Sequence, residues 1–269
     1  MKILLVCIII ILTCLLIYSI YYQPNIIFTC TTFFDFTKQD RWITFCQGID
    51  SILQYHSPET LSRIVRWVVV NEYSPNSNMD WVTICQQKYP FIEVIQKTYN
   101  QKGQAASMNI ILDTIRPYSY WIHWEETWYI EKPCFNKMMR IMDTTDITQL
   151  QITKLNNTVN WLDGPHHCLK DYCIILPTKD THKYLDECPY TMKPEFWSNW
   201  PHYSLLPSIN RVSDYKYLGY FSTDPALWPI KFEWDFARRW YKAGCTKAVL
   251  PDGPAVRDFK NHKSTYTKD

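Results

Sequence analysis

The chain has 269 residues, of which 46% are apolar, and is therefore long enough for one large domain or two small ones with packed cores. Its 28 Lys and Arg residues nearly balance 26 Asp and Glu residues, which leaves a formal net charge of +2. This balance provides no broad positive field, so we expect no nucleic-acid partner. Aromatic residues make up 16% of the chain. More than half of them are expected in the core, and the others are suited to stacking on sugar rings.

Residues 3–22 form an apolar run that is interrupted only by Thr13 and Ser19. As a helix that rises about 1.5 Å per residue, the run would cross the roughly 30 Å hydrocarbon layer of a membrane. An uncleaved signal-anchor is favoured over a cleaved signal peptide, because the residues after Ser19 make a poor cleavage site. Lys2 precedes the run and no Lys or Arg follows until Lys38, which predicts a cytoplasmic N-terminus and a lumenal or exterior chain.

Cysteines and a glycosylation sequon agree with this placement. An oxidising compartment allows disulfides, and Cys168 and Cys173, with Cys188 nearby, form the most plausible local cluster. A zinc site built from His166–Cys168 and Cys173 is the alternative, which is disfavoured because no second spaced ligand pair accompanies it. Asn156 begins the N-glycosylation sequon Asn-Asn-Thr, which is consistent with a lumenal surface.

Beyond the membrane run, short apolar runs alternate with amphipathic stretches, which is typical of βαβ units around a parallel sheet. Strands are expected at 26–34, 64–70, 91–98 and 118–123, and helices at 41–55, 79–88 and 105–114. The later half predicts strands at 147–154, 217–222 and 246–250, a helix at 233–243, and loops with short helices at 165–207. No repeat or linker is visible. The expected organisation is a membrane helix at 1–24, one globular domain at 25–259 and a polar tail at 260–269.

Polar residues follow each of the first four predicted strands. In a parallel α/β sheet, ligands bind at the carboxyl ends of the strands, so these residues are the first candidates for a site. They are Thr31 and Thr32 at the end of the first strand, Asn71 and Glu72 after the second, Lys102 after the third, and Glu125 and Glu126 after the fourth.

Four segments, in the expected order, resemble motifs of the GT-A nucleotide-diphospho-sugar glycosyltransferases, particularly the large inverting group numbered family two. Residues 71–77 resemble the strand and loop that hold the nucleobase and ribose, and residues 102–109 resemble the Gly-x-Ala-x-x-x-Asn helix start beside the donor. Residues 124–128 stand where the family has its Asp-x-Asp signature. Residues 233–239 resemble the acidic motif that contains the catalytic base, and the whole resemblance extends over about 26–258.

The resemblance implies a GT-A fold, with a mostly parallel sheet flanked by helices, and a single-displacement transfer with inversion. The donor would be a nucleotide-sugar, and the acceptor a hydroxyl of a glycan, protein or lipid. Glu233 is the implied base, with Asp235 second, and a positioned carboxylate base contributes roughly 10²–10⁴-fold to rate. The implied donor-binding residues are Thr31, Thr32, Asn71, Glu72, Lys102, Asn109, Glu126 and Arg257.

The leaving diphosphate requires a compensating positive charge, for which the family uses a divalent cation such as Mn²⁺ or Mg²⁺. Glu125 is the implied metal ligand. Two departures put the metal in doubt, because Thr127 replaces the second acid and Arg257 aligns with the family's later metal-binding His. Arg257 could itself supply the charge, since a guanidinium binds phosphate oxygens in a bidentate manner.

Other functions stay open or are disfavoured. A catalytically inactive relative that binds glycans or serves as a structural membrane protein is the first alternative, with Thr127 as its main support, and a retaining transferase is the second. Glu233 at a helix start also has a structural explanation, because an acid there interacts favourably with the helix dipole. The chain lacks a Gly-x-Ser-x-Gly elbow and has only 6 Gly, which disfavours a serine hydrolase and a P-loop.

Acceptor contacts are expected from 166–206, where Trp197, Trp200, His202 and Tyr203 can stack on a sugar ring.

Overall fold

The computed structural model describes residues 25–35, 39–74, 80–153, 166–177, 203–224 and 231–257, with four single residues at 10, 13, 181 and 185. Most of the apolar run at 3–22, the sequon at Asn156, the predicted tail at 260–269, and the aromatic residues Trp197, Trp200 and His202 lie outside this part. Within it, no helix combines the length and the apolar character that a membrane crossing requires.

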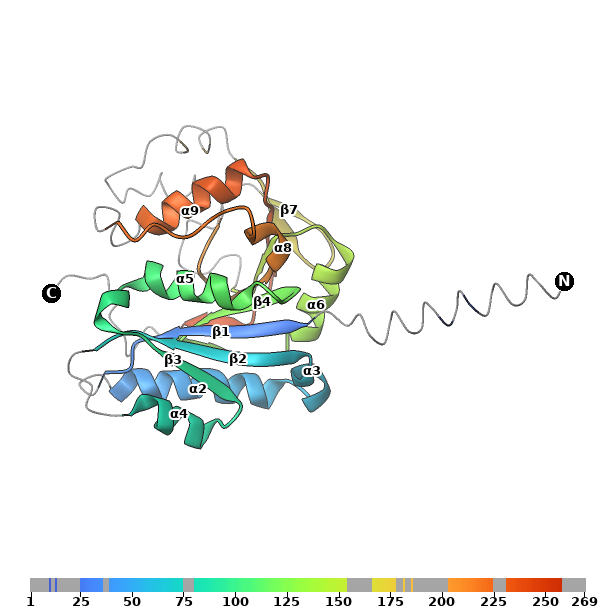
Figure 1. Cartoon of the computed structure of the whole chain (residues 1–269). Helices are drawn as coiled ribbons and strands as arrows, with labels where there is room; N and C mark the ends of the chain where they lie inside the picture. Colours follow the sequence, from blue (N-terminus) through green and yellow to red (C-terminus); the bar gives the residue numbers. More distant parts are fainter. Residues whose placement is uncertain are drawn as a thin grey trace.

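A mixed sheet of nine strands in the described residues forms the centre of the molecule, in the order β3-β2-β1-β4-β9-β6-β10-β8-β7 (Figure 1). The first four strands of the chain pair in parallel, namely β1 (Ile26–Thr32), β2 (Ile64–Asn71), β3 (Ile92–Gln96) and β4 (Tyr120–Glu125). The antiparallel strand β9 (Ser208–Arg211) separates β4 from β6 (Gln149–Gln151). Beyond β6, β10 (Lys247–Val249) runs parallel to it, and the hairpin of β7 (His166–Cys168) and β8 (Cys173–Ile175) completes the sheet.

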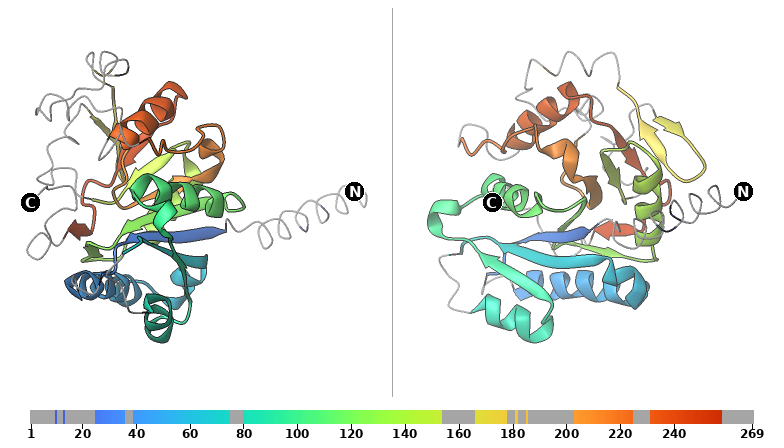
Figure 2. Two further views of the ribbon diagram at one scale, coloured as in Figure 1. Left: turned by 60° about the vertical axis from the view of Figure 1, so that its left-hand side comes forward. Right: turned by 45° about the vertical axis from the view of Figure 1, so that its right-hand side comes forward.

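Helices cover both faces of this sheet (Figures 1 and 2). One face carries α2 (Gln39–Tyr55), α4 (Trp81–Lys88) and α6 (Phe135–Thr144), and the other carries α5 (Gln104–Ile115), α8 (Val212–Tyr215) and α9 (Lys231–Lys242). Successive strand residues point to opposite faces, so Phe28 and Ile27 of β1 belong to different hydrophobic cores. The remaining elements are α3 (Pro58–Ser62), η2 (Tyr99–Gln101) and a two-stranded sheet of β5 (Trp128–Ile130) and β11 (Ala255–Arg257).

Local sequence explains the main helices. Phe45, Ile49 and Ile52 of α2 recur at helical spacing and are buried against the sheet. Gly48 in the same helix permits a close approach to β5, because a Cβ atom there would lie 2.5 Å from the carbonyl oxygen of Trp128. Asp80 caps α4 by accepting a hydrogen bond from the amide of Thr83 at 3.1 Å.

The predicted α/β sheet with flanking helices is confirmed, and the later half of the chain supplies the corrections. No strand forms at the predicted residues 217–222; the strand is β9, whose single apolar residue, Ile209, leaves no alternating pattern to detect. The helix α6 lies in a stretch for which no element was expected. The region 165–207, expected to hold loops and short helices, contains the β7–β8 hairpin, and a disulfide joins Cys168 to Cys173 across it. That disulfide removes both thiols from the alternative zinc site.

Candidate active site

The carboxyl ends of the parallel strands bring the predicted residues to one edge of the sheet. Thr31 of β1 is in register with Val70 of β2 on one side and with Glu125 of β4 on the other. Thr32 is in register with Asn71, the last residue of β2. The segments that follow β1, β2 and β4 therefore leave the sheet side by side.

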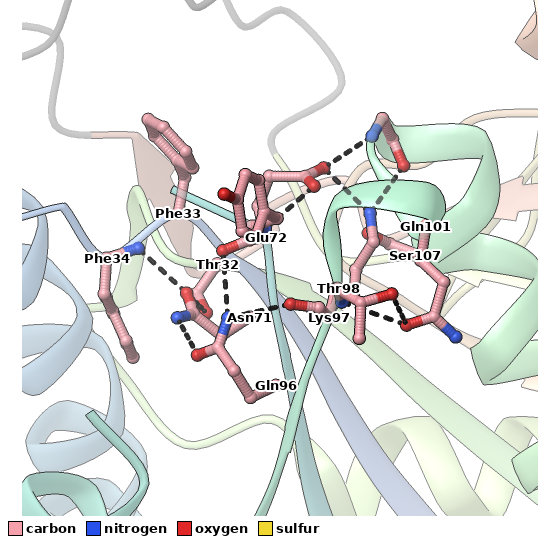
Figure 3. A network of polar contacts seen from close by, with 12 residues as sticks. Thr32, Phe33, Phe34, Asn71, Glu72, Gln96, Lys97, Thr98, Gln101 and Ser107 are labelled. Atoms are coloured by element: carbon pink, nitrogen blue, oxygen red, sulfur yellow. Dashed lines mark hydrogen bonds and ion pairs between the residues drawn. The ribbon is translucent and has the colours of Figure 1, made fainter. Parts of the chain in front are cut away.

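Asn71 joins the ends of three strands and is only 1% exposed (Figure 3). Its Oδ1 accepts hydrogen bonds from the Thr32 hydroxyl at 3.0 Å and from the Phe34 amide at 2.8 Å. Its Nδ2 donates to Oε1 of Gln96 at 2.8 Å. Through these contacts, Asn71 and Thr32 stabilise the conformation of the loop after β1.

Glu72 accepts hydrogen bonds from the amides of Tyr73 and Gly103, both at 2.9 Å, and from Nζ of Lys97 at 2.8 Å (Figure 3). A carboxylate has about four acceptor positions, so one position of Glu72 is left for a ligand. The Lys97 ammonium is buried and also donates to the Gly103 carbonyl and the Ser107 hydroxyl, both at 2.8 Å. Sequence reasoning missed Lys97 because the predicted strand extended to residue 98; its position directly after β3 was the available signal.

Glu126 is buried and tied to other parts of the protein. It forms an ion pair with Arg41 of α2 and accepts a hydrogen bond from the Phe33 amide at 2.5 Å. Burial raises the pKa of its carboxyl, and the Arg41 charge opposes that rise. Glu126 therefore fastens the loop after β1 to α2, and nothing in the sequence near it indicated Arg41.

Glu125 lies beside the start of α5. Its Oε1 accepts from Nε2 of Gln104 at 3.3 Å, and its Oε2 accepts from Nε1 of Trp128 at 3.2 Å. Burial raises the pKa of this carboxyl, and the charge of Arg257 opposes the rise. Because the adjacent residues Gly103 and Gln104 bond Glu72 and Glu125 respectively, both carboxylates converge on the N-terminus of α5.

Glu233 lies in the first turn of α9 and faces the same region. Its Oε1 accepts a hydrogen bond from the Leu205 amide at 3.0 Å. Burial raises its pKa to about 7, the Glu125 charge adds to the rise, and the Lys247 charge opposes it. Lys247 is 2% exposed, and burial lowers its pKa to about 7. Sequence reasoning missed Lys247, and a lysine opening a short apolar strand was its only signal.

Three other predicted residues have different surroundings. Asp235 forms ion pairs with Arg239 at 3.0 Å and Arg238 at 3.5 Å on its own helix, so it is not brought together with Glu233. The amide of Asn109 exchanges two hydrogen bonds, of 2.9 and 2.7 Å, with the backbone of Phe221. Lys102 is exposed and directly precedes Gly103, whose amide donates to Glu72.

The side chains around Glu125 do not fit a divalent cation. Among the residues that the structure describes, no three His, Cys, Asp or Glu side chains are grouped to hold a metal ion. Thr127, at the position of the second acid, is buried and neutral, and Glu126 is engaged by Arg41. The neighbours of Glu125 are hydrogen-bond donors and a cation, so the described side chains offer a metal ion little besides this one carboxylate, and water and substrate phosphates would have to supply its other oxygen ligands.

This fold and the arrangement of its strand-end site define the class: the chain has the fold of the GT-A nucleotide-sugar glycosyltransferases. Residues 1–349 of S. aureus TarS match with a TM-score of 0.51 and 16% identity, over 84% of this chain and 58% of that one. GalNAc-T7 with UDP, GalNAc and Mn²⁺ matches with a TM-score of 0.54 and 12% identity, over 88% and 44% of the two chains. The mannosyltransferase PcManGT of Pyrobaculum calidifontis, in complex with GDP-Man and Mn²⁺, matches with a TM-score of 0.53 and 13% identity, over 88% and 57%.

This chain thus spans between 44% and 58% of the length of these three structures. At such identities the likeness establishes the fold alone. No protein-family model and no curated protein sequence matches the chain.

Proposed function

We propose that this protein transfers a sugar from a nucleoside-diphosphate donor to a hydroxyl of a glycan, protein or lipid acceptor, with inversion at the anomeric carbon. The GT-A fold supports the donor class. The observation that carries the proposal is the environment of Glu233. Its carboxylate accepts a hydrogen bond from the Leu205 amide, and burial together with the charge of Glu125 raises its pKa. Glu233 would then act as the base next to Glu125.

The nucleoside would lie over the segments that follow β2 and β3. The rings of Tyr73 and Tyr99 meet edge to face at 5.7 Å there, and Tyr99 is 69% exposed. An exposed ring of this kind offers a stacking surface for a nucleobase. The remaining acceptor position of Glu72 suits a ribose hydroxyl, which donates a hydrogen bond.

The transfer is one displacement. Glu233 takes the proton of the acceptor hydroxyl while the acceptor oxygen forms a bond to the anomeric carbon. The bond from that carbon to the diphosphate oxygen breaks, and its electron pair leaves with the nucleoside diphosphate. A single attack from the face opposite the leaving group inverts the anomeric configuration.

A panel of UDP-, GDP- and dTDP-sugars, incubated with the full chain in detergent, tests this proposal. We expect one donor to release its nucleoside diphosphate and to label an acceptor, and NMR of the product should show the inverted anomer. Retention of configuration would favour the retaining alternative.

Thr127 is the observation that favours a non-catalytic protein, because a neutral hydroxyl stands where the family has its second acid. On that alternative, a nucleotide-sugar or glycan would bind, as detected by calorimetry, while no donor in the panel is turned over.

A further inference from the structure

We propose that the guanidinium of Arg257, and not a divalent cation, neutralises the diphosphate of the donor. This inference rests on the proposed function, since it assigns the group that binds the phosphates of that same donor. It starts from the disagreement between the side chains around Glu125 and the ligands that a metal ion requires.

Arg257 is held beside Glu125 by the two-stranded sheet. In the antiparallel pairing of β11 with β5, Arg257 is in register with Trp128. Its guanidinium lies 5.9 Å from the centre of the Trp128 ring, and Nε1 of the same ring donates to Glu125 at 3.2 Å. The Trp128 side chain therefore contacts both Arg257 and Glu125.

The position of β11 depends on Gly253, which lets the chain before the strand pass close to Ile152. A Cβ atom at Gly253 would lie 2.2 Å from the Ile152 carbonyl oxygen, a distance that only glycine avoids. Two residues later, Ala255 forms a bridge to Thr153. Ala255 is thus paired with Thr153 on one side and with Ile130 of β5 on the other, and this strand pairing positions Arg257.

The chemistry around Glu125 suits a guanidinium. Gln104 and Trp128 both donate to this carboxylate, and the positive charge of Arg257 opposes the rise in its pKa that burial causes. A guanidinium is a planar cation with five N–H groups, and it binds phosphate oxygens in a bidentate manner. Arg257 thereby supplies the positive charge that a metal ion would otherwise provide.

The start of α5 offers open space and a favourable charge for the phosphates. Gly103 at the start of α5 has φ of +101°, and a Cβ atom there would meet nothing within 4 Å. The N-terminus of a helix favours negative charge, and the exposed Lys102 precedes it. The helix N-terminus and Lys102 thus add positive charge to that of Arg257, at the end of the segment that follows β3.

Calorimetry on the full chain tests the inference, with UDP, GDP and dTDP titrated in EDTA and again in MnCl₂. Uridine, guanosine and thymidine serve as ligands without phosphates. The variants are Arg257→Gln, Arg257→Lys and the matched control Arg66→Gln, which changes an arginine near the amino end of β2 that pairs with Glu93. Circular dichroism confirms that each variant is folded.

We expect a nucleoside diphosphate to bind equally well, within about twofold, in EDTA and in MnCl₂. Arg257→Gln should weaken that binding about 10- to 150-fold without affecting the nucleoside, because a hydrogen bond to a charged group contributes about 1.5–3 kcal/mol. Arg257→Lys should lose less, and Arg66→Gln should bind as the parent chain does.

Binding that is lost in EDTA and restored by MnCl₂ would overturn the inference and leave the proposed function intact. The same holds if Arg257→Gln binds the diphosphate as tightly as the parent chain. If none of UDP, GDP and dTDP binds in either buffer, the proposed function fails, and this inference fails with it.

Discussion

The carboxylate of Glu233 must be ionised to accept a proton, and its surroundings control that ionisation. Burial and the nearby charge of Glu125 raise its pKa to about 7. A base with a raised pKa is protonated and inactive below that value and ionised above it, so activity should increase with pH.

We therefore expect kcat/KM to be low at about pH 5.5, to rise through about pH 7 and to level off above about pH 8. The measurement is a profile of kcat/KM, which reports the ionisation of the free enzyme, with circular dichroism at each pH to show that the fold persists. A profile that is flat between about pH 5.5 and pH 8 would contradict the assignment of Glu233 as the base.

Tyr99 provides a second test at the scale of single residues. Tyr99→Ala removes the exposed ring that we assign to the nucleobase, and stacking of one base on an aromatic side chain contributes about 1–3 kcal/mol. The affinity for the preferred nucleoside diphosphate, measured by calorimetry, should fall about 5- to 150-fold.

The matched control is Tyr217→Ala, which removes a tyrosine that is 90% exposed and lies on the segment after α8. Equal affinities of the two variants would show that Tyr99 does not contact the base.

At the scale of elements, the sequence predicted the first half of the fold well because each element there has its own apolar pattern. The Val-Val-Val run of β2 is buried on both faces, and the apolar residues of α2 recur at helical spacing. In contrast, β9 was missed because its pairing between β4 and β6, and not its own composition, makes it a strand.

The same distinction applies to the site. Glu72 and Glu125 could be found because a polar residue after an apolar run marks a strand end. Arg41 and Lys247 could not, because their roles depend on partners far away in the chain; Arg41 and Glu126 are 85 residues apart. The surroundings of Asn109 and Asp235 likewise depend on tertiary contacts that no local pattern reveals.

The interaction between Glu233 of α9 and Lys247 of β10 leads to a prediction for Lys247. Its positive charge lowers the pKa of Glu233, so Lys247→Met removes that effect and should shift the acidic limb of the kcat/KM profile to higher pH. Burial lowers the pKa of Lys247 itself to about 7, so its ammonium is only partly charged on this limb. Lys247→Arg stays charged at every pH and should move the limb to lower pH.

Thermal unfolding of both variants separates this effect from a loss of structure. A limb that stays in place in a folded Lys247→Met variant would show that the two side chains do not interact in the active protein.

At the scale of the whole molecule, the described domain begins at Asn25, next to the amino end of β1. The candidate site lies at the carboxyl ends of the strands, so an anchor at 3–22 would enter at the opposite edge of the sheet. The disulfide between Cys168 and Cys173 agrees with a lumenal or exterior domain, because disulfides persist in oxidising compartments.

We propose that 3–22 anchors the protein in a membrane. The full chain expressed in eukaryotic cells should stay in the membrane pellet after carbonate extraction, and Asn156→Gln should abolish a glycan-dependent shift in electrophoretic mobility. A mature N-terminus near Gln23, or release of the protein by carbonate, would contradict the anchor.

The most direct test of the central claim compares Glu233→Gln with Asp235→Asn in the transfer reaction. Glu233→Gln keeps the size of the side chain and removes its basicity, so kcat should fall about 10²- to 10⁴-fold while donor affinity changes little. Asp235→Asn alters an acid that pairs with Arg238 and Arg239, and it should cost much less. Near-normal turnover by Glu233→Gln, with turnover abolished in Asp235→Asn, would place the base two residues further on. Normal turnover by both variants would contradict a glycosyltransferase base on α9.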